Sequence, residues 1–198
     1  MTYYRSVSTD PARLEVVHYP AEVLRRKAAP ADLPAAELAV IADRMIHLMR
    51  REEGIGLAAP QVGLPIRLFV VDVPPGDGRT AQGPSPSATE GPIVLVNPAA
   101  AALEGIPQLH EEGCLSLPDI RGDVMRPPKV TFRAHDLSGR EFTIEASGLL
   151  ARCLQHELDH LDGILILDRM TQMSRLRNRA AVRDLERSAV PRGRHPPR

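Results

Sequence analysis

The residues best placed to do chemistry lie in the stretch 155–160, which reads Gln-His-Glu-Leu-Asp-His. It sits within residues 147–161, where apolar side chains recur at steps of three and four, and this spacing predicts an amphipathic helix. Residues four apart lie on one helix face, so His156 and His160 can both point at one metal ion. Glu157, beside the first histidine, can then reach a water molecule on that metal as general base. We favour this H-E-x-x-H interpretation over a solvated helix face.

Two histidines do not complete a catalytic metal site, which needs three protein ligands and an open fourth position. The candidates for the third ligand are the two cysteines, Cys114 and Cys153. Three ligands in a row along one helix cannot readily surround an ion, and Cys153 lies on the same predicted helix as His156. Cys114, in a Gly-Cys-Leu-Ser turn, arrives from another segment and is the better candidate. We place Cys153 in the core or in a cavity wall, and a small buried hydrophobic role remains the alternative for both thiols.

Length and composition set the bounds for the rest of the chain. The 198 residues suffice for one domain with a core and leave little room for two. Aromatic residues make up only 3%, so the core must consist of Leu, Val, Ile and Ala. Basic and acidic residues balance at 25 each, which argues against a polyanion-binding protein and gives no basis for sequence-specific nucleic-acid recognition. No apolar run approaches a membrane span and residues 1–10 lack a signal-peptide core, so we expect no membrane association and a cytoplasmic location with free thiols.

The elements that must position the reactive residues follow from periodicity and from turn residues. The predicted helices are a short one at 21–27, one from 34 to about 52, the central one at 147–161, and a last one from 170 to about 188. The predicted strands lie at 67–73, at 93–96 before Asn97-Pro98, and in a hairpin of 129–135 and 141–146, with 99–109 as a candidate continuation of the sheet. Residues 74–92 are rich in Gly, Pro, Ser and Thr and are expected to form an exposed, mobile loop.

Residues 54–63 (GIGLAAPQVG) are mostly small, which lets their backbone come close to another group. Taken alone, we interpret the run as a loop, because it matches no phosphate-binding pattern. Gln61 is its only polar side chain.

Three stretches resemble the motifs of the peptide deformylase family in its bacterial form: GIGLAAPQ at 54–61, EGCLS at 112–116 and QHELDH at 155–160. The match extends from about Val16 to Asp168. With the elements above, the resemblance implies an α+β fold, with mixed or antiparallel β-sheets packed around the central H-E-x-x-H helix, N-terminal helices and a C-terminal helix. It implies one catalytic domain over residues 1–188, followed by a flexible basic tail over 189–198.

The resemblance also implies an activity and a cofactor. The activity is hydrolysis of the N-formyl group from the formyl-methionine at the N-terminus of nascent polypeptides, with release of formate. The cofactor is one divalent metal ion, with Fe²⁺ native and Zn²⁺, Ni²⁺ or Co²⁺ found in isolated protein. Cys and His ligands suit iron and zinc alike.

Carried over residue by residue, the resemblance assigns metal binding to three residues, Cys114, His156 and His160. Glu157 is the base, while Gln61 and the backbone N–H of Leu115 hold the carbonyl oxygen of the substrate. The methionine pocket is lined by Gly54, Ile55, Gly56, Leu149 and Cys153.

Further residues surround this centre. The resemblance gives Glu112 a supporting role, paired with Arg126, and places Arg121 near the peptide. Two features depart from the family pattern. His110 stands where an apolar pocket residue is expected, and the 74–92 loop is longer than usual.

Two other functions stay open. A zincin-type metallopeptidase also uses H-E-x-x-H, but its third ligand would lie C-terminal to the motif, where the chain offers only Asp162, Asp168, Glu186 and His195. A non-catalytic ribosome-binding relative could use the basic last helix, which carries Arg175, Arg177, Arg179, Arg183 and Arg187. A charge run is usually a solvated face, although such a helix could also dock an active enzyme near the ribosomal exit.

Overall fold

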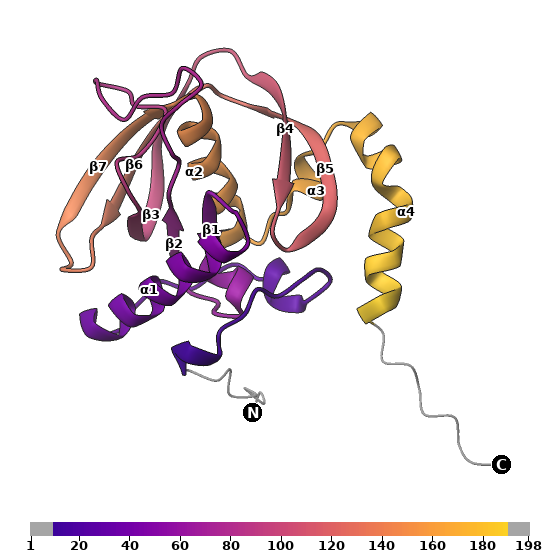
Figure 1. Cartoon of the computed structure of the whole chain (residues 1–198), viewed down its shortest axis with the longest axis horizontal. Helices are drawn as coiled ribbons and strands as arrows, with labels where there is room; N and C mark the ends of the chain where they lie inside the picture. The colour runs from indigo at the N-terminus through magenta and orange to yellow at the C-terminus, as the bar shows by residue number, and fades with distance from the viewer. Residues whose placement is uncertain (1–9, 190–198) are drawn as a thin grey trace.

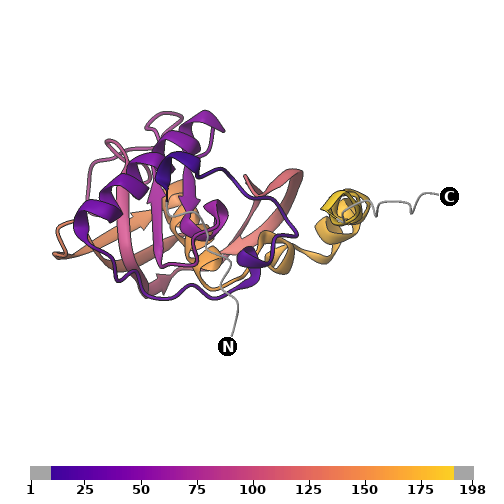
Figure 2. The same cartoon turned by 90° about the horizontal axis from the view of Figure 1, so that it is seen from below.

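Two antiparallel sheets lie on either side of one helix in the computed structural model, which describes residues 10–189. The helix is α2 (Gly148–Leu161), and it carries the H-E-x-x-H residues. Figure 1 shows α2 between the larger sheet and the ribbon formed by β4 and β5, and Figure 2 shows the same arrangement from below. The predicted α+β fold around a central H-E-x-x-H helix is therefore confirmed, with antiparallel pairing throughout the strand ladders of the described residues.

The larger sheet has five strands in the order β1-β2-β3-β6-β7. Their bounds are β1 Gly56–Ala58, β2 Leu68–Val71, β3 Ile93–Glu104, β6 Lys129–His135 and β7 Glu141–Ser147. The predicted hairpin is confirmed as β6 and β7, and its turn contains Gly139 at φ +81°, in the left-handed region that glycine adopts without strain.

The second sheet is a two-stranded ribbon of β4 (Gln108–Cys114) and β5 (Leu117–Arg126). The pairing runs from Gln108 opposite Arg126 to Cys114 opposite Leu117, with a register irregularity between Gly113 and Cys114. The ribbon therefore ends in a tight turn that contains Leu115 and Ser116. The sequence patterns above did not identify these two strands. The first four residues of β4 are exposed, and the strand lacks the alternation of apolar and polar residues that marks a half-buried strand.

The remaining helices surround these sheets. They are the 3₁₀ turns η1 (Pro11–Arg13), η2 (Glu22–Arg25) and η3 (Ala59–Val62), and the α-helices α1 (Ala35–Arg51), α3 (Ile166–Arg169) and α4 (Gln172–Ala189). The predicted stripe on α1 is buried as expected: Leu38, Ile41, Met45, Leu48 and Met49. The prediction of a helix over residues 21–27 was wrong, because the structure has only the 3₁₀ turn η2, of four residues, in this segment.

The core is aliphatic, as the composition required, with two aromatic side chains at its centre. Phe69 of β2 and Phe132 of β6 are fully buried and meet edge to face, with ring centroids 6.5 Å apart. Such a pair adds about 0.5–1.5 kcal/mol beyond the burial of its area. On one face of the sheet, Leu150, Leu154 and Leu161 of α2 join this cluster, so the reactive helix is anchored through its apolar side.

The predicted end of a strand at Asn97-Pro98 was wrong. β3 continues to Glu104, and its register against β6 shifts between Val96 and Ala99. Asn97 adopts φ +50°, a left-handed conformation that Asn tolerates better than most residues. Its side chain also exchanges hydrogen bonds with the backbone N–H and C=O of Ala31. A bulge therefore absorbs the Asn-Pro pair without ending the strand.

Two predicted loops are more ordered than their composition indicates. Residues 56–58 form β1, which pairs with β2, and Gln61 lies in η3 with 1% of its surface exposed. In the 74–92 segment, Ala88 and Thr89 are buried, and the carbonyl of Pro86 accepts a hydrogen bond from the N–H of Ser147. Residues 74–84 are mostly exposed, as expected, but the later part of the segment packs at the beginning of α2.

The C-terminal helix α4 stands beyond the ribbon in both views (Figures 1 and 2) and packs against β5. It contacts Asp123 through Ser174 and Arg177, and the backbone of Arg121 through Asn178. No helix within residues 10–189 is long and apolar enough to cross a membrane. The predicted flexible tail falls, apart from Ala189, outside the described residues, and the single-domain boundary at 188 stays a prediction.

Candidate active site

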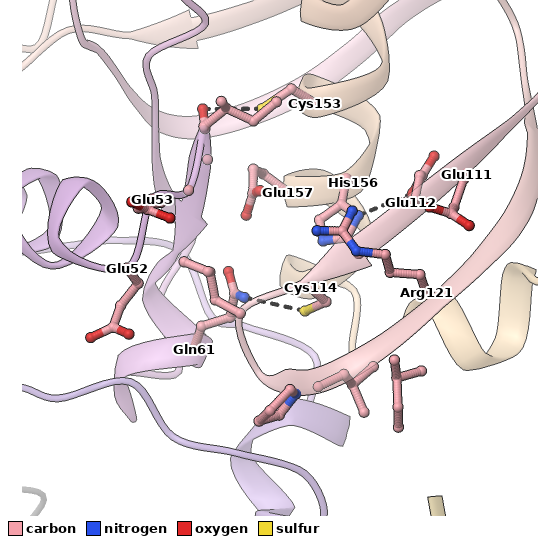
Figure 3. Close-up of a pocket in the computed structure, with 18 of the residues that line it drawn as sticks. Glu52, Glu53, Gln61, Glu111, Glu112, Cys114, Arg121, Cys153, His156 and Glu157 are labelled. Atoms are coloured by element: carbon pink, nitrogen blue, oxygen red, sulfur yellow. Dashed lines mark hydrogen bonds and ion pairs between the residues drawn. The ribbon is translucent and has the colours of Figure 1, made fainter. Parts of the chain in front are cut away.

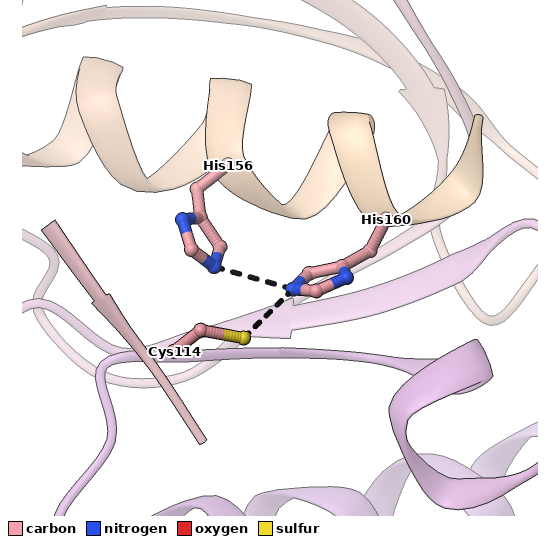
Figure 4. Close-up of side chains that lie close together, drawn as sticks. All are labelled: Cys114, His156 and His160. Atoms are coloured by element: carbon pink, nitrogen blue, oxygen red, sulfur yellow. Dashed lines mark hydrogen bonds between the residues drawn. The ribbon is translucent and has the colours of Figure 1, made fainter. Parts of the chain in front are cut away.

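The two histidines of α2 point to one spot beside the helix, one turn apart. Their Nε2 atoms lie 3.2 Å from each other, and their rings meet at 69° (Figure 4). Cys114, at the end of β4, reaches the same spot from the ribbon, with its Sγ 3.3 Å from Nε2 of His160. One ligand atom from each of the three residues lies within 4.8 Å of the other two. The third potential ligand thus comes from a different element, as the tetrahedral argument required.

These distances can be compared with those of a bound ion. Bonds of about 2.0–2.1 Å to nitrogen and about 2.3 Å to sulfur place tetrahedral ligand atoms roughly 3.3–3.6 Å apart. The observed separations of 3.2 and 3.3 Å are close to that range. The donor set of one thiol and two imidazoles therefore fits a zinc-like or iron-like ion.

The surroundings affect the pKa values of the two histidines in opposite directions. Burial lowers the pKa of His160 well below its ordinary value, which keeps this ring neutral and able to bind a metal. Burial alone would also lower the pKa of His156, but hydrogen bonds with Cys114 and Glu112 raise it well above its ordinary value. A metal ion at this position would have to displace that proton, because a histidine ligand must be deprotonated.

The other cysteine is held apart from this cluster. Cys153 is buried, and its Sγ donates to the carbonyl of Ile55 at 3.4 Å. Burial raises the pKa of its thiol, so Cys153 is a neutral donor in a cavity wall. This is the place expected for it.

Glu157 lies on the sheet side of the site, next to β1. Its carboxyl group is buried, and Oε2 has no hydrogen-bond partner within the described part of the chain. Burial raises the pKa of Glu157 to about 7, against the opposing positive charge of His156. A carboxyl group with a pKa near neutrality and a free oxygen is suited to accept and return a proton.

Gly56 makes room for that carboxyl group. A Cβ atom at this position would lie 2.4 Å from Oε1 of Glu157 and 2.7 Å from Sγ of Cys153. The absence of a side chain at residue 56 is therefore what lets β1 approach α2 so closely.

Gln61 faces the ligands from η3. Its Oε1 accepts the backbone N–H of Ala58 at 2.8 Å, which directs Nε2 to Cys114 Sγ at 3.5 Å and Ser116 Oγ at 3.4 Å. Leu115, between these two partners, lines the same cavity. An amide donor and a turn backbone thus lie beside the sulfur of Cys114.

A buried ion-pair network supports the cluster from behind. Arg126 binds Glu112 with two nitrogens, at 2.6 and 2.9 Å, and donates to Asp159 at 2.8 Å. Glu112 in turn contacts Nδ1 of His156 at 3.1 Å. Burial alone would raise the pKa of Glu112, but the hydrogen bonds from His156 and Arg126 hold it well below its ordinary value, so the carboxylate stays charged. The expected pairing of Glu112 with Arg126 is present.

A cavity of about 640 Å³ opens beside these groups (Figure 3). In Figure 3, Glu52 and Glu53 stand on one side of it, and Glu111 and Arg121 reach in from the ribbon on the other. The residues expected around the substrate all line this cavity, and so does the supporting residue Glu112: Gly54, Ile55, Gly56, Glu112, Arg121, Leu149 and Cys153. His110, the departure from the family pattern, lines a smaller neighbouring cavity of about 200 Å³ instead. The larger cavity is therefore shaped without the His110 ring.

Sequence reasoning missed several neighbours of the site. Arg152 pairs with Glu112, Asp159 pairs with Arg126 and Arg169, and His18 lines the cavity from the N-terminal segment. Arg152 could have been found from its spacing, because it lies one helical turn before His156. Nothing in the local sequence indicates the position of His18.

Comparison with known proteins agrees with this geometry. The profile of the family described as polypeptide deformylase matches residues 13–176. The chain belongs to the polypeptide deformylase family. It is similar to the peptide deformylase of Chlorobium luteolum, with 42% identity over 178 residues that cover 90% of this chain and 89% of that protein. It is also similar to the peptide deformylase of Thermodesulfovibrio yellowstonii, with 44% identity over 83% of this chain and 93% of that protein.

Solved structures of deformylases superpose on most of this chain. Peptide deformylase from Plasmodium falciparum aligns with a TM-score of 0.81 at 29% identity, covering 91% of this chain and all of that one (100%). Peptide deformylase 1B from Arabidopsis thaliana, solved with an inhibitor, aligns with a TM-score of 0.78 at 39% identity, covering 88% and 91% of the two chains.

Membership in the deformylase family argues against the zincin-type interpretation. The acidic residues considered for that alternative are engaged elsewhere: Asp162 with Arg67, Asp168 with Arg25, and Glu186 with Tyr19. His195 lies outside the described residues.

Proposed function

We propose that this chain hydrolyses the N-formyl group of formyl-methionine at the N-terminus of nascent polypeptides and releases formate. The observation that carries the proposal is the meeting of Cys114, His156 and His160 beside the buried carboxyl group of Glu157. Family membership supports the substrate class.

A divalent ion held by these three residues would supply Lewis-acid chemistry, since it polarises a carbonyl group and makes water nucleophilic near neutral pH. The protein's own part begins with Glu157, which takes a proton as the oxygen of water attacks the formyl carbon. The C–N bond then breaks, and Glu157 returns that proton to the leaving amine. The products are formate and a free N-terminal methionine, so water supplies every atom that the products gain.

The oxygen of the formyl group becomes negative during this attack. Nε2 of Gln61 can donate to it, because the other end of this amide is bound to Ala58. The backbone N–H of Leu115 is the second donor in our proposal. Removing one such donor typically costs about 10²–10³ in rate.

The methionine side chain would enter the cavity and lie against the wall formed by Leu149, Cys153 and Gly56. Gly54 and Ile55 would lie beside the peptide backbone. Within residues 10–189, β1 pairs with one strand, β2, and lies at the edge of the sheet. An extended peptide can therefore lie along its free side, as strands add to a sheet edge. Arg121, at the opposite rim, would contact the peptide beyond the methionine.

The ion itself is the finer part of the proposal. We propose Fe²⁺ as the native metal, with Zn²⁺, Ni²⁺ or Co²⁺ as substitutes in isolated protein, because one thiolate with two imidazoles accepts all of these. A location in the cytoplasm, where nascent chains begin, stays a prediction.

The test is release of formate from formyl-Met-Ala-Ser by protein loaded with iron or with zinc in parallel. We expect turnover with both metals, and Glu157→Ala should retain one equivalent of metal while nearly all turnover is lost. Cys114→Ser should instead lose metal affinity. Cleavage of internal peptide bonds without formate release would contradict the proposal, as would full metal affinity in Cys114→Ser.

Docking at the ribosome through α4 is a second proposal. The helix buries only Ser174 and exposes five arginines, of which Arg177 pairs with Asp123 and Arg187 with Asp184. Co-sedimentation with ribosomes, compared between the native chain and Arg179→Glu/Arg183→Glu, tests it. Equal binding of the two would leave α4 as a solvated helix.

A further inference from the structure

Arg152 lies on α2 four residues before His156, and its guanidinium group points to the ribbon of β4 and β5. Nη2 donates to the carbonyl of Gln108 at 2.8 Å, and Nη1 donates to the carbonyl of Val124 at 3.0 Å. Nη1 also donates to Oε1 of Glu112 at 2.7 Å. One side chain, only 11% exposed, therefore spans from the helix to both strands of the ribbon.

Glu112 is shared between two guanidinium groups and one histidine. Its Oε1 accepts from Arg126 at 2.6 Å and from Arg152 at 2.7 Å. Its Oε2 accepts from Arg126 at 2.9 Å and contacts Nδ1 of His156 at 3.1 Å. Each carboxylate oxygen can accept about two hydrogen bonds, so this carboxylate is fully engaged and cannot rotate without losing partners.

The three proposed ligands belong to two separate parts of the fold. His156 and His160 are on α2, whereas Cys114 is on the ribbon, and the ligand atoms must stay within a few ångströms of one another. Within residues 10–189, side chains rather than backbone hydrogen bonds connect α2 to β4 and β5. Beside the apolar packing of β5 against Ile166 and Met170, which follow α2, a small number of buried polar contacts therefore fixes the relative position of the two parts.

We propose that Arg152 is a positioning residue of the metal site, which fixes α2 against the ribbon and orients the ring of His156 through Glu112. Arg126, on β5, holds the same carboxylate and also donates to Asp159 on α2, so it is a second link between the ribbon and the helix. Its printed contacts do not include the carbonyls of Gln108 and Val124, which Arg152 binds. Partners of this kind typically change metal affinity or activity by 10–100-fold when removed, as an order of magnitude. The effect on turnover rests on the proposed function, but the effect on metal affinity does not.

The variant to make is Arg152→Met. Methionine keeps an unbranched side chain and a good helix propensity, but it has no donors. Gln108 and Arg152 both line the small cavity of about 200 Å³, so water can enter there and replace some of the hydrogen bonds that Arg152 made. We therefore expect the variant to fold.

The measurement is the dissociation constant of Zn²⁺ and Co²⁺ by competition with a chromophoric chelator, together with the visible spectrum of the Co²⁺ form. Arg152→Met should bind both ions about 10–100-fold more weakly. Its Co²⁺ spectrum should shift, because the ligand geometry around the ion is less constrained. Arg152→Lys retains one charged donor group but not the planar guanidinium with its several donors. Its metal affinity should lie between those of the native protein and Arg152→Met.

Arg67→Met is the matched control. Arg67 has similar chemistry, since it donates to Asp162 at 2.9 Å and to the carbonyls of Leu161 and Pro98, and its side chain is 17% exposed. It braces the other end of α2, against the large sheet. We expect Arg67→Met to lower the melting temperature but to leave metal affinity and the Co²⁺ spectrum unchanged.

Two results would overturn the proposal. One is an Arg152→Met protein with native metal affinity and a native Co²⁺ spectrum, whatever its melting temperature. The other, decisive if Arg152→Met does not fold, is an Arg152→Lys protein with native affinity. Failure of the native protein to release formate would refute the proposed function but would leave the comparison of metal affinities valid.

Discussion

The side-chain amide of Gln61 is oriented toward the sulfur of Cys114, with Nε2 at 3.5 Å from Sγ, because Oε1 is bound to the N–H of Ala58 at 2.8 Å. No exposed loop residue would be held in this way. Gln61 therefore has two separable contributions, one to the stability of η3 and one to the chemistry beside Cys114.

Gln61→Leu should lower kcat for formyl-Met peptides at least about a hundredfold, since the donor to the developing oxyanion is lost. KM should change less, because that hydrogen bond strengthens in the transition state. The buried N–H of Ala58 also loses its acceptor, so we expect a stability loss of about 1–3 kcal/mol. This loss follows from the burial of Gln61, which the interpretation of residues 54–63 as a loop did not indicate. Steady-state kinetics with metal analysis and thermal unfolding measure both effects. Weaker substrate binding at unchanged kcat would leave Gln61 as a residue that only positions the substrate.

Gly56→Ala should impair turnover without removing the metal ligands. Its Cβ would lie 2.4 Å from Oε1 of Glu157, so the carboxyl group or the strand has to move. A displacement of about 1 Å can cost on the order of 10²-fold in rate. Gly54→Ala is the comparison, because its closest contact, at 2.8 Å, is the flexible end of Leu115, which can rotate away. If both alanine variants keep native kcat and KM, the close approach of β1 to Glu157 has no catalytic importance.

The pH dependence of the metal-free protein should reveal the burial of Glu157. Its folded-state pKa of about 7 lies above the model-compound value of 4.5, so the folded state binds the proton more tightly than the unfolded state. The stability from this group is complete below about pH 4.5 and is lost as the pH rises toward 7. Glu157→Gln lacks this loss, and between pH 4 and 8 it should gain about 2–4 kcal/mol relative to the native chain. Denaturant unfolding at several pH values measures it. If the free energy of unfolding has the same pH dependence in the two proteins, the folded state does not raise the pKa of Glu157.

The iron-loaded protein should lose activity in hydrogen peroxide, whereas the zinc-loaded protein should resist. Cys114 lines the open cavity and is only partly buried, so a thiolate on a redox-active ion is accessible there. Cys153→Ala should keep the sensitivity of the iron form, because Cys153 is buried and its thiol stays protonated. Equal rates of inactivation for the two metal forms would contradict this expectation.

The parts of the fold that could be predicted from the sequence are those that depend on local periodicity. The spacing of His156 and His160 placed both rings on one face of α2, and the stripe from Leu38 to Met49 marked the buried side of α1. The β6–β7 hairpin followed from alternation around Ser138-Gly139. Each of these features depends on residues close in sequence, where helix and strand geometry fix what lies next to what.

Only the tertiary structure decided how the separate segments meet. The ribbon of β4 and β5, the burial of Gln61 and the contacts of Arg152 all depend on residues that are distant in sequence, such as Arg152 and Gln108. The sequence indicated Cys114 as the third ligand, first by its place on another segment and then by the family resemblance, but its distance from His160 is set by the packing of the ribbon against α2. A sequence pattern records the faces of single elements, whereas the position of one element on another arises from packing and buried ion pairs that no local pattern encodes.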